Sequence, residues 1–560
     1  MSDDQPGGGN LGNGAGGPMV QAIALLKEGR LDESKAVCER VLDGNGDHVD
    51  AIYAMGWIAF SQRDQETALA RFRRVIELNP AHARAHNNIG MILMKAGDAA
   101  GAAAAAAYFE SAITLEPPLR EAHANLGTAL MIQAKFGAAR EVFQNALDLV
   151  PDDPSVLTNL ATAKMRLGEV DQAIADYQTV VSLDPEFAEA HNNLAHALRL
   201  KGRMADAVES LERGLAARPD SVELLTNLGV THYQMGTYET ALADYERALV
   251  IMPDQGRALF LKAFPLLALE RFEEGWAAYL ERPGVAALAA GLHREPLAPD
   301  LTGTTIALRS EGNPSDDLNF LRFVPELSRR GASIVMRPGS KVEPLALTID
   351  GIGGIAAGDE AGEGPGELDV ALGDLPYLLG MKTFGDLPPP VRIRPDGPGA
   401  DVLAARLKAA GPAPLMGVTW QDGGPGGLPL ADLGPALAAA GGGTIIMLQP
   451  GVGSDAAGKL AEGSGLPVVD FSDVMEDAAG ALTVVSGLDV YVTVPNIGLD
   501  LRQATGGAAE VMVPWPPDFR LAGTNDASPW LPRCRLHRAA PGADWQGALL
   551  TLSHALAAGA

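Results

Sequence analysis

A repeat of small residues and prolines runs through the first half of the chain and limits what that half can fold into. Six small residues recur at one position of successive units: Gly56, Gly90, Gly127, Ala161, Ala195 and Gly229. Six prolines close the units: Pro80, Pro117, Pro151, Pro185, Pro219 and Pro253. Four of the five spacings between these prolines are 34 residues, a period typical of helix–turn–helix repeats. Because small residues let helices approach closely and proline ends a helix, the pattern predicts an α-solenoid of paired helices.

A large side chain completes each unit and is expected to fill the gap between its two helices. These side chains are Phe72, Phe109, Phe143, Tyr177, Leu211 and Tyr245. The one longer spacing, Pro80 to Pro117, contains an alanine-rich run at 101–107, which predicts a lengthened helix or turn. Together these features resemble tetratricopeptide repeats over residues 18–285, with six clear units between Val49 and Pro253. Residues 1–17, mostly Gly, Asn and Asp, are expected to be disordered.

Asparagine stands two residues before the small residue in five consecutive units. The five are Asn88, Asn125, Asn159, Asn193 and Asn227. An Asn side chain offers both a donor and an acceptor, which suits binding of a peptide backbone without regard to its sequence. The alternative is that these residues only cap or solvate the groove. The pattern resembles the asparagine ladder in the repeats of protein O-GlcNAc transferases. The nearby histidines follow the repeat frame without clustering, so we predict solvated groove residues and no metal site.

After Pro283, short β-rich runs alternate with helical stretches, which is typical of parallel sheets covered by helices. The expected strands are Thr305–Leu308, Ala332–Met336, Leu415–Thr419, Thr444–Leu448, Val490–Val494 and Glu510–Val513. The expected helices are Asp316–Arg329, Asp401–Ala410, Leu430–Ala440 and Val474–Ser486. We predict a linker at 286–304 and two α/β lobes at 305–395 and 396–560.

The charge balance excludes several classes of partner. The chain has 43 Lys and Arg against 70 Asp and Glu, a net charge of −27. Such a surface repels phosphate backbones and anionic lipids, so we expect neither nucleic-acid nor membrane-surface binding. Two cysteines, Cys38 and Cys534, cannot form a disulfide framework or a thiolate metal site. With no secretion signal and no apolar run long enough to span a bilayer, a cytoplasmic location is expected.

Ligands of parallel sheets bind at the carboxyl ends of the strands, where three loops are candidates. In the first, Asp316 could be a general base, but a carboxylate at a helix start is also typical of an N-cap, which we favour on the residues alone. The second, residues 421–427, has glycines but no Lys or Arg, which favours a flexible surface loop. In the third, Asn496 would cap the next helix and leave its amides for a diphosphate, with Arg502 farther along.

Three segments resemble the glycosyltransferase half that follows tetratricopeptide repeats in many bacterial proteins. They are Phe320–Pro325, Val490–Ala504 and Ser528–Pro532. The resemblance covers nearly all of residues 300–560 and implies the Rossmann-like, two-lobed GT-B fold of the lipopolysaccharide heptosyltransferases. It implies a nucleotide-sugar donor, no other cofactor, and a protein acceptor such as flagellin. Asp316 falls at the family's catalytic aspartate, and Asn496, Asp500, Arg502 and Arg520 fall near the donor.

The sequence departs from this family at the residues that matter most for a donor. Asn313-Pro314-Ser315-Asp316 replaces a Gly-Leu-Gly-Asp turn, and Asp500 replaces a histidine on the phosphate-facing helix. A carboxylate there opposes an anionic donor. Two hypotheses therefore stay open. One is a metal-independent transferase that moves a sugar to a Ser or Thr hydroxyl, with Asp316 as base. The other is an inactive glycosyltransferase-like scaffold that mediates protein–protein interaction.

Overall fold

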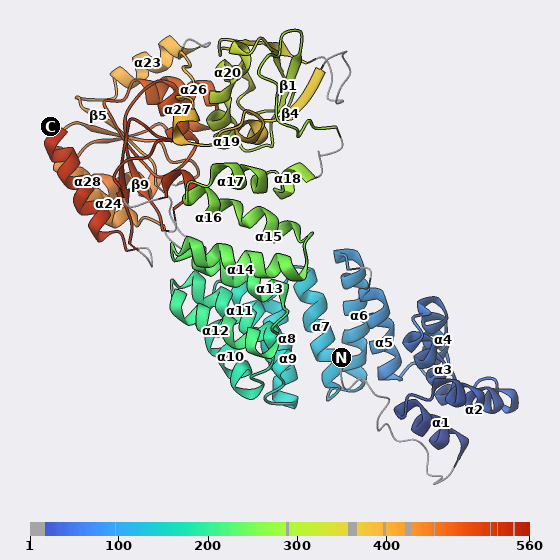
Figure 1. Cartoon of the computed structure of the whole chain (residues 1–560). Coiled ribbons are helices and arrows are strands. Elements are labelled where there is room, and N and C mark those ends of the chain that lie inside the picture. Colours follow the sequence, from blue (N-terminus) through green and yellow to red (C-terminus); the bar gives the residue numbers. More distant parts are fainter. Residues whose placement is uncertain are drawn as a thin grey trace. The chain divides into compact units, whose positions relative to one another are not determined.

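The computed structural model describes residues 17–95, 97–286, 291–356, 367–395, 399–420, 427–452, 454–515, 517–522, 525–540 and 544–559 (Figure 1). The predicted disorder of residues 1–17 therefore concerns residues almost entirely outside this set. The chain divides into two compact units, one ending at Ala197 and one beginning at Leu198.

The first unit is built from paired helices. Its helices are α1 Pro18–Lys27, α2 Leu31–Gly44, α3 Val49–Ser61, α4 Gln65–Leu78, α5 Ala83–Met94, α6 Ala99–Leu115, α7 Arg120–Ile132, α8 Phe136–Leu149, α9 Pro154–Arg166 and α10 Val170–Leu183. Helix α11, Ala188–Leu200, continues into the second unit. Helix α6 has 17 residues where α4 and α8 have 14, so the alanine-rich insertion lengthens a helix, as predicted.

Each glycine at the repeat's small position lies against the aromatic ring of the paired helix. A Cβ on Gly90 would lie 2.6 Å from Phe109 Cε1, and one on Gly127 would lie 2.4 Å from Phe143 Cε1. Both rings are fully buried. Since such distances are closer than carbon atoms can approach, the glycines set the separation of the two helices. This pair sets the helix separation within each unit, while neighbouring units also share apolar cores, such as the one that joins α6 to α9.

Three of the repeat histidines bridge the turn between units instead of lining the groove as solvated residues. In each case Nε2 forms a hydrogen bond with the carbonyl oxygen of the unit-closing proline, six residues earlier. The pairs are His86–Pro80 at 3.0 Å, His123–Pro117 at 2.9 Å and His191–Pro185 at 3.0 Å. The expectation of solvated histidines is therefore wrong for these three, because the proline carbonyl has no helical partner and accepts their ring N–H.

The second unit begins with the last repeats. Its helices are α12 Met204–Ala217, α13 Val222–Gln234, α14 Tyr238–Ile251, α15 Gly256–Leu261, α16 Ala263–Ala268, α17 Phe272–Tyr279 and α18 Pro283–Ala286. Helices α15 and α16 occupy the place of one repeat helix, interrupted at Lys262. Pro265 explains the break, because it has no amide hydrogen and its ring clashes with the carbonyl four residues earlier.

Two parallel sheets follow. The first has β1 Thr305–Arg309, β2 Ser333–Met336, β3 Ile352–Ile355 and β4 Glu367–Ala371, in the order β3-β2-β1-β4. The second has β5 Leu415–Val418, β6 Thr444–Met447, β7 Val468–Asp470, β8 Val490–Thr493, β9 Ala509–Val513 and β10 Cys534–Arg538, in the order β10-β9-β8-β5-β6-β7. The second order is that of the doubly wound Rossmann fold, whose switch point lies between its first and fourth strands. Here those strands are β5 and β8, and in the first sheet they are β1 and β4.

Helices connect the strands and cover the sheets. The α-helices are α19 Pro314–Phe320, α20 Val324–Arg329, α21 Glu343–Ala346, α22 Leu375–Leu378, α23 Ala400–Lys408, α24 Leu430–Leu437, α25 Ser454–Ser464, α26 Ala478–Ser486, α27 Ile497–Ala504 and α28 Gln546–Gly559. The 3₁₀-helices are η1 Leu321–Phe323, η2 Leu372–Asp374, η3 Phe384–Asp386, η4 Ala438–Ala440, η5 Ser472–Glu476 and η6 Phe519–Leu521. All six predicted strands are present, and all four predicted helices correspond to helical segments, some of them interrupted by a 3₁₀ turn.

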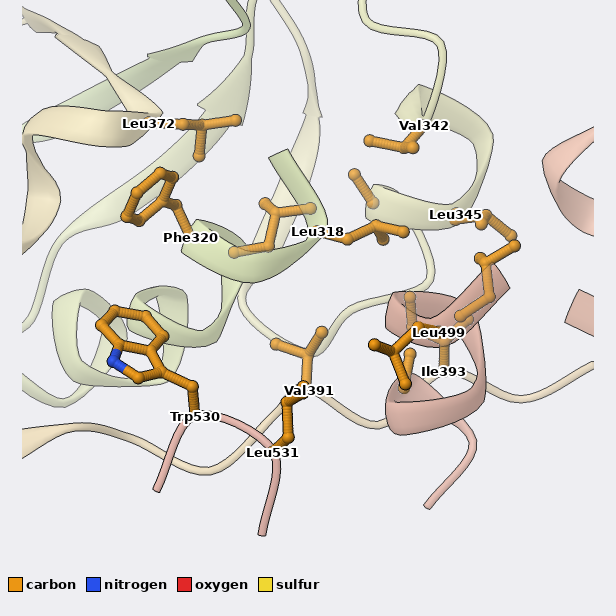
Figure 2. Packing of buried hydrophobic residues seen from close by; sticks show 14 of the residues in the cluster. Leu318, Phe320, Val342, Leu345, Leu372, Val391, Ile393, Leu499, Trp530 and Leu531 are labelled. Carbon is orange, nitrogen blue, oxygen red and sulfur yellow. The ribbon is translucent and has the colours of Figure 1, made fainter. Parts of the chain in front are cut away.

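One hydrophobic core joins the last repeat helices to both sheets. Trp276 of α17 is 1% exposed, and its ring centre lies 6.3 Å from Phe320, 5.8 Å from Phe519 and 6.0 Å from Trp530. Figure 2 shows part of this core, to which α19 contributes Phe320 and α27 contributes Leu499. Domain boundaries at 285 and 395 stay a prediction, but side chains on both sides of these positions share this core.

Candidate functional site

The carboxyl ends of β1 and β8 lead into helices α19 and α27, which lie against each other. A small pocket opens there, with a volume of about 70 Å³. It is lined by Ser315, Asn319, Pro495, Asn496, Leu499, Asp500, Arg520, Leu521 and Leu531. This is the place where the strand order of an open parallel sheet puts a ligand. Its volume is far below the roughly 300–1,000 Å³ of pockets for small-molecule ligands.

Asp500 joins the two lobes across this pocket. Its carboxylate, on α27, accepts a hydrogen bond from Asn319 Nδ2 at 2.7 Å and another from Ser315 Oγ, both on α19. Burial raises the pKa of Asp500 to about 6, although Arg520 and these two donors act in the opposite direction. An anion therefore does occupy the predicted donor site, and it is the protein's own carboxylate.

Arg520 is the cation of the site. Its Nε donates to Asp518 Oδ1 at 2.9 Å, and its Nη1 lies 3.4 Å from Asp316 Oδ1. Burial opposes the charge of this guanidinium, but the carboxylates of Asp518, Asp500 and Asp316 outweigh burial and raise its pKa above the usual value. Three carboxylates therefore surround Arg520, and the charge of a second arginine, buried Arg322, also acts on Asp500.

Asp316 is not the N-cap of α19, and the cap interpretation is wrong. Asn313 caps this helix by accepting from the Ser315 amide at 3.1 Å, and its Nδ2 donates to Asp316 Oδ2 at 2.8 Å. Burial raises the pKa of Asp316, and the Arg520 charge counteracts part of that rise. Asn313 takes the cap because it directly precedes the first helical residue, Pro314, whereas Asp316 is the third residue of the helix.

Asn496 caps α27, as the sequence predicts. Its Oδ1 accepts from the Leu499 amide at 3.2 Å, and its Nδ2 donates to Thr419 Oγ1 at 2.9 Å. Thr419 follows β5, so the cap also joins the two strands at the switch point of the second sheet. The use of the α27 amides for a diphosphate stays a prediction.

Arg502 does not face the pocket. Its guanidinium donates to the backbone carbonyls of Val485, Leu488 and Ala508 at 2.5, 3.1 and 3.0 Å. The expectation that Arg502 neutralises a leaving phosphate therefore does not fit its position. It lies in the second turn of α27, where the helix turns it toward the protein interior. Ser315 and Asn319 are the contacts that sequence reasoning missed, although their four-residue spacing on a helix after β1 places them on one face.

The five repeat asparagines do not have the same surroundings. Asn88 is buried and donates to the Tyr53 hydroxyl at 3.1 Å, and Asn125 donates to Asn87 Oδ1 at 3.0 Å. In these two, the amide nitrogen already donates to a side chain of the neighbouring first helix that is not a ladder position.

The surroundings of the other three ladder asparagines are different. Asn159 and Asn193 are half-buried and form no side-chain hydrogen bond with any residue that the structure describes. Asn227, in the second unit, accepts from Arg257 Nη2 at 3.0 Å. Asn159 and Asn193 therefore keep their side-chain amides unused among the described residues, and binding of a peptide backbone by the ladder stays a prediction.

Within the described residues, no group of three or more His, Cys, Asp or Glu side chains is arranged to hold a metal ion. In the same part of the chain, no helix combines the length and the apolar character needed to cross a membrane. The glycine-rich loop at 421–426 lies outside the described residues, so its interpretation as a surface loop stays a prediction.

Solved structures of repeat proteins are similar to part of the chain. YrrB, described as a TPR protein with an unusual peptide-binding site, is 23% identical, with 34% of this chain and 97% of that chain covered and a TM-score of 0.29. PilW, described as a widely conserved type IV pilus biogenesis factor, is 23% identical over 38% of this chain and 96% of that one, with a TM-score of 0.35. PilF of Pseudomonas aeruginosa is 20% identical over 37% of this chain and 93% of that one, with a TM-score of 0.34.

Family models describe the same region. No curated protein matches the sequence. One tetratricopeptide-repeat model matches residues 53–108, 158–222 and 205–257, and a second matches residues 130–175. Residues 53–108 and 130–257 of this chain therefore contain tetratricopeptide repeats, and the α-solenoid predicted from their period is confirmed.

Proposed function

We propose that this chain is a protein-binding scaffold. Its tetratricopeptide repeats would hold a partner polypeptide, and its two α/β lobes would keep the GT-B architecture of a glycosyltransferase without a working donor site. Repeats of this family bind peptides or proteins, and the doubly wound strand order supports descent from a nucleotide-binding fold.

One observation carries the scaffold proposal: the Asp500 carboxylate accepts hydrogen bonds from Ser315 and Asn319 in the position expected for the donor phosphates. A nucleotide sugar would have to break both bonds, separate α19 from α27, and approach a carboxylate. Each of these steps opposes binding.

A calorimetric titration of the full chain with a panel of nucleotide sugars tests this proposal. We expect no saturable heat up to millimolar concentration. Asp500→His removes the carboxylate and supplies a possible cation, and Asp432→Asn, at an exposed position of α24, is the matched loss of charge. Saturable binding to the unaltered protein would contradict the scaffold proposal.

The repeats are tested separately. We expect Asn159→Ala with Asn193→Ala to weaken capture of partner polypeptides by about 2 kcal/mol, or about 1 kcal/mol for each lost hydrogen bond. Gln178→Ala, on the exposed side of the second helix α10, is the control for a lost amide. Capture that is equally strong in the double variant would argue against backbone binding by the ladder.

The second candidate function is a protein O-glycosyltransferase with a nucleotide-sugar donor and an acceptor such as flagellin. Asp316 favours it, because this carboxylate follows β1, has a raised pKa through burial, and lies 3.4 Å from Arg520. A general base contributes roughly 100- to 10,000-fold, so Asp316→Asn would remove nearly all sugar transfer and leave donor binding intact. An unchanged transfer rate would exclude Asp316 as the base.

A further inference from the structure

A second pocket lies in the second unit, beside the last strand of the larger sheet. It opens between β10, helix α28 and residues 525–526, and its volume is about 410 Å³. The pocket between α19 and α27 has about 70 Å³. The second pocket, unlike the first, therefore has a volume in the range of small-molecule sites, roughly 300–1,000 Å³. Its lining includes the hydroxyl of Thr551 and the imidazole of His537, which neither function proposed above uses.

Three side chains from consecutive elements form a hydrogen-bonded chain at this pocket. Thr551 Oγ1, on α28, lies 2.8 Å from His537 Nδ1, on β10. The other ring nitrogen, Nε2, lies 2.8 Å from Glu510 Oε2, on β9. A nucleophile, its base and the group that orients the base are linked in this order in hydrolases, at distances of roughly 2.6–3.2 Å. The three side chains have this order and these distances.

The Glu510 carboxylate determines which ring nitrogen carries the proton. An ionised carboxylate only accepts hydrogen bonds, so Nε2 of His537 carries the proton that faces it. In the neutral ring, Nδ1 is then an acceptor, and the Thr551 hydroxyl is the donor that faces it. The same hydroxyl lies 2.9 Å from the carbonyl oxygen of Ala548, its alternative acceptor. The ring is therefore held in the tautomer that can take the proton of Thr551.

The exposure of each group fits a catalytic role. Thr551 is exposed, whereas His537 is 1% exposed. A substrate can therefore reach the hydroxyl, while the imidazole is shielded from bulk water. Arg535 lies two residues before His537, on the same face of β10, and 52% of its side chain is exposed at the pocket. Its charge suits a carbonyl oxygen that becomes negative in a transition state.

The charged groups around the pocket balance. Arg535, Arg538 and Asp526 line it, and Glu510 lies behind the imidazole. Arg538 is held in the wall, since its Nε donates to the Asn525 carbonyl oxygen at 2.8 Å. With two positive and two negative groups, the pocket has no net charge that would select an ion, so the substrate that it fits is uncharged.

We propose that Thr551 and His537 are the catalytic residues of an esterase activity, with Glu510 as the residue that positions His537. The substrates are small uncharged carboxylic esters, and water is the co-substrate. This activity is separate from partner binding by the repeats and from the pocket at Asp500.

The reaction has two steps, and His537 carries the proton in both. In the first, Thr551 Oγ1 attacks the carbonyl carbon of the ester and its proton passes to Nδ1. The bond from this carbon to the leaving oxygen breaks, the alcohol leaves with the proton from Nδ1, and the acyl group stays on Thr551. In the second, water attacks the acyl carbon and gives a proton to Nδ1. The bond to Thr551 breaks, its oxygen recovers that proton, and the carboxylic acid leaves.

Hydrolysis of p-nitrophenyl acetate by the full chain tests the proposal. We expect release of p-nitrophenol and, in samples quenched early, an acetyl group on Thr551, located by mass spectrometry of proteolytic peptides. Thr551→Val keeps the shape of the side chain and should lower the rate by about 100-fold or more, whereas Thr551→Ser should stay active. The control is Ser553→Ala, which removes a hydroxyl that donates to the Leu549 carbonyl oxygen in the same helix. It should not change the rate.

Two further variants test the base and its orientation. His537→Gln should lose as much rate as Thr551→Val. Glu510→Gln should lower kcat and leave KM unchanged, a split that a general loss of packing would not produce. Thermal unfolding checks that each variant is folded, and because Thr551 is exposed, the decisive variant does not alter the core.

Three results would overturn the proposal. They are an equal rate in Thr551→Val, acetyl groups only on lysines or on the N-terminal amine, and no hydrolysis above the rate in buffer. Any of them would leave His537 with a structural role, in which it joins β9, β10 and α28 through its two hydrogen bonds.

Discussion

The repeat helices up to Ala197 and the two sheets after residue 300 achieve stability by different means. In the repeats, one glycine and one aromatic ring in the same unit set the packing, as Gly127 and Phe143 do. In the sheets, one core joins residues from distant parts of the chain, and it encloses charged groups. Burial lowers the pKa of Arg322, which donates to the Trp530 carbonyl, to about 10.

This difference in packing decides how easily each region can change its binding residues. Local packing lets each repeat vary in its exposed residues without disturbing the next repeat, which suits a surface that recognises partners. The buried charges of the sheets depend on many elements at once. One residue there has several partners at once: the Asp500 carboxylate binds Ser315 and Asn319, and its charge acts on Arg520.

The largest effect is expected at the shared core. Trp276→Ala removes a ring that packs on Phe320, Phe519 and Trp530, and should destabilise the second unit by about 3–5 kcal/mol. Hydrogen exchange should show lost protection in both α17 and the sheets. Phe72→Ala, in α4 of the first unit, should act only on nearby repeats. If the sheets keep full protection in Trp276→Ala, the comparison between local and shared packing fails.

Arg502 comes next. Arg502→Met leaves the carbonyls of Val485, Leu488 and Ala508 without their donor, and should lower the free energy of unfolding by about 3 kcal/mol. Urea unfolding measures this change, and Arg394→Met, at an exposed position, is the control. An unchanged unfolding midpoint would mean that Arg502 is free to serve a ligand after all.

The pH dependence of stability tests Asp500. Its folded pKa, about 6, lies above the usual value for Asp, so the folded state binds this proton more tightly than the unfolded state does. The stabilisation that the folded state gains from the proton on Asp500 is complete below about pH 4 and is lost as the pH rises through 6. Asp500→Asn should therefore match the unaltered protein near pH 4 and exceed it at pH 7.5 by about 3 kcal/mol, at about 1.4 kcal/mol per pKa unit. Urea unfolding between pH 4 and 7.5 measures this, with Asp432→Asn as control, and a variant less stable at pH 7.5 would contradict it.

The smallest effect contrasts two glycines of one repeat. A Cβ on Gly127 meets the Phe143 ring, whereas a Cβ on Gly137, in α8, meets no atom within 4 Å. Gly127→Ala should destabilise the first unit by about 1–3 kcal/mol, and Gly137→Ala should stabilise it by up to about 1 kcal/mol. Thermal unfolding of both variants measures the contrast, and equal shifts would show that the repeat spacing tolerates a larger residue.

Much of the sheet half could also be predicted, but not its strands β3, β4, β7 and β10. The six predicted strands have continuous apolar runs. The sequence shows no such run at β3, which is Ile-Gly-Gly-Ile, or at β10, where Cys534, Leu536 and His537 are separated or flanked by arginines. His537 is nevertheless buried in β10, because Glu510 and Thr551 each form a hydrogen bond with its ring at 2.8 Å. Partners that lie far apart in sequence leave no local signal.

The sequence by itself determined the repeat fold. The contact between a small residue and a large side chain lies within one unit, and it recurs with a period of 34 residues that can be seen in the sequence. It also determined the positions of Asp316, Asn496 and Asp500 at the carboxyl ends of strands. Only the tertiary structure decided that Ser315 and Asn319 bind Asp500 and that Arg502 turns away from the pocket. The physical reason is distance along the chain. Hydrogen bonds and charge pairs between residues as much as 284 positions apart depend on how the elements pack, and no periodic pattern encodes that packing.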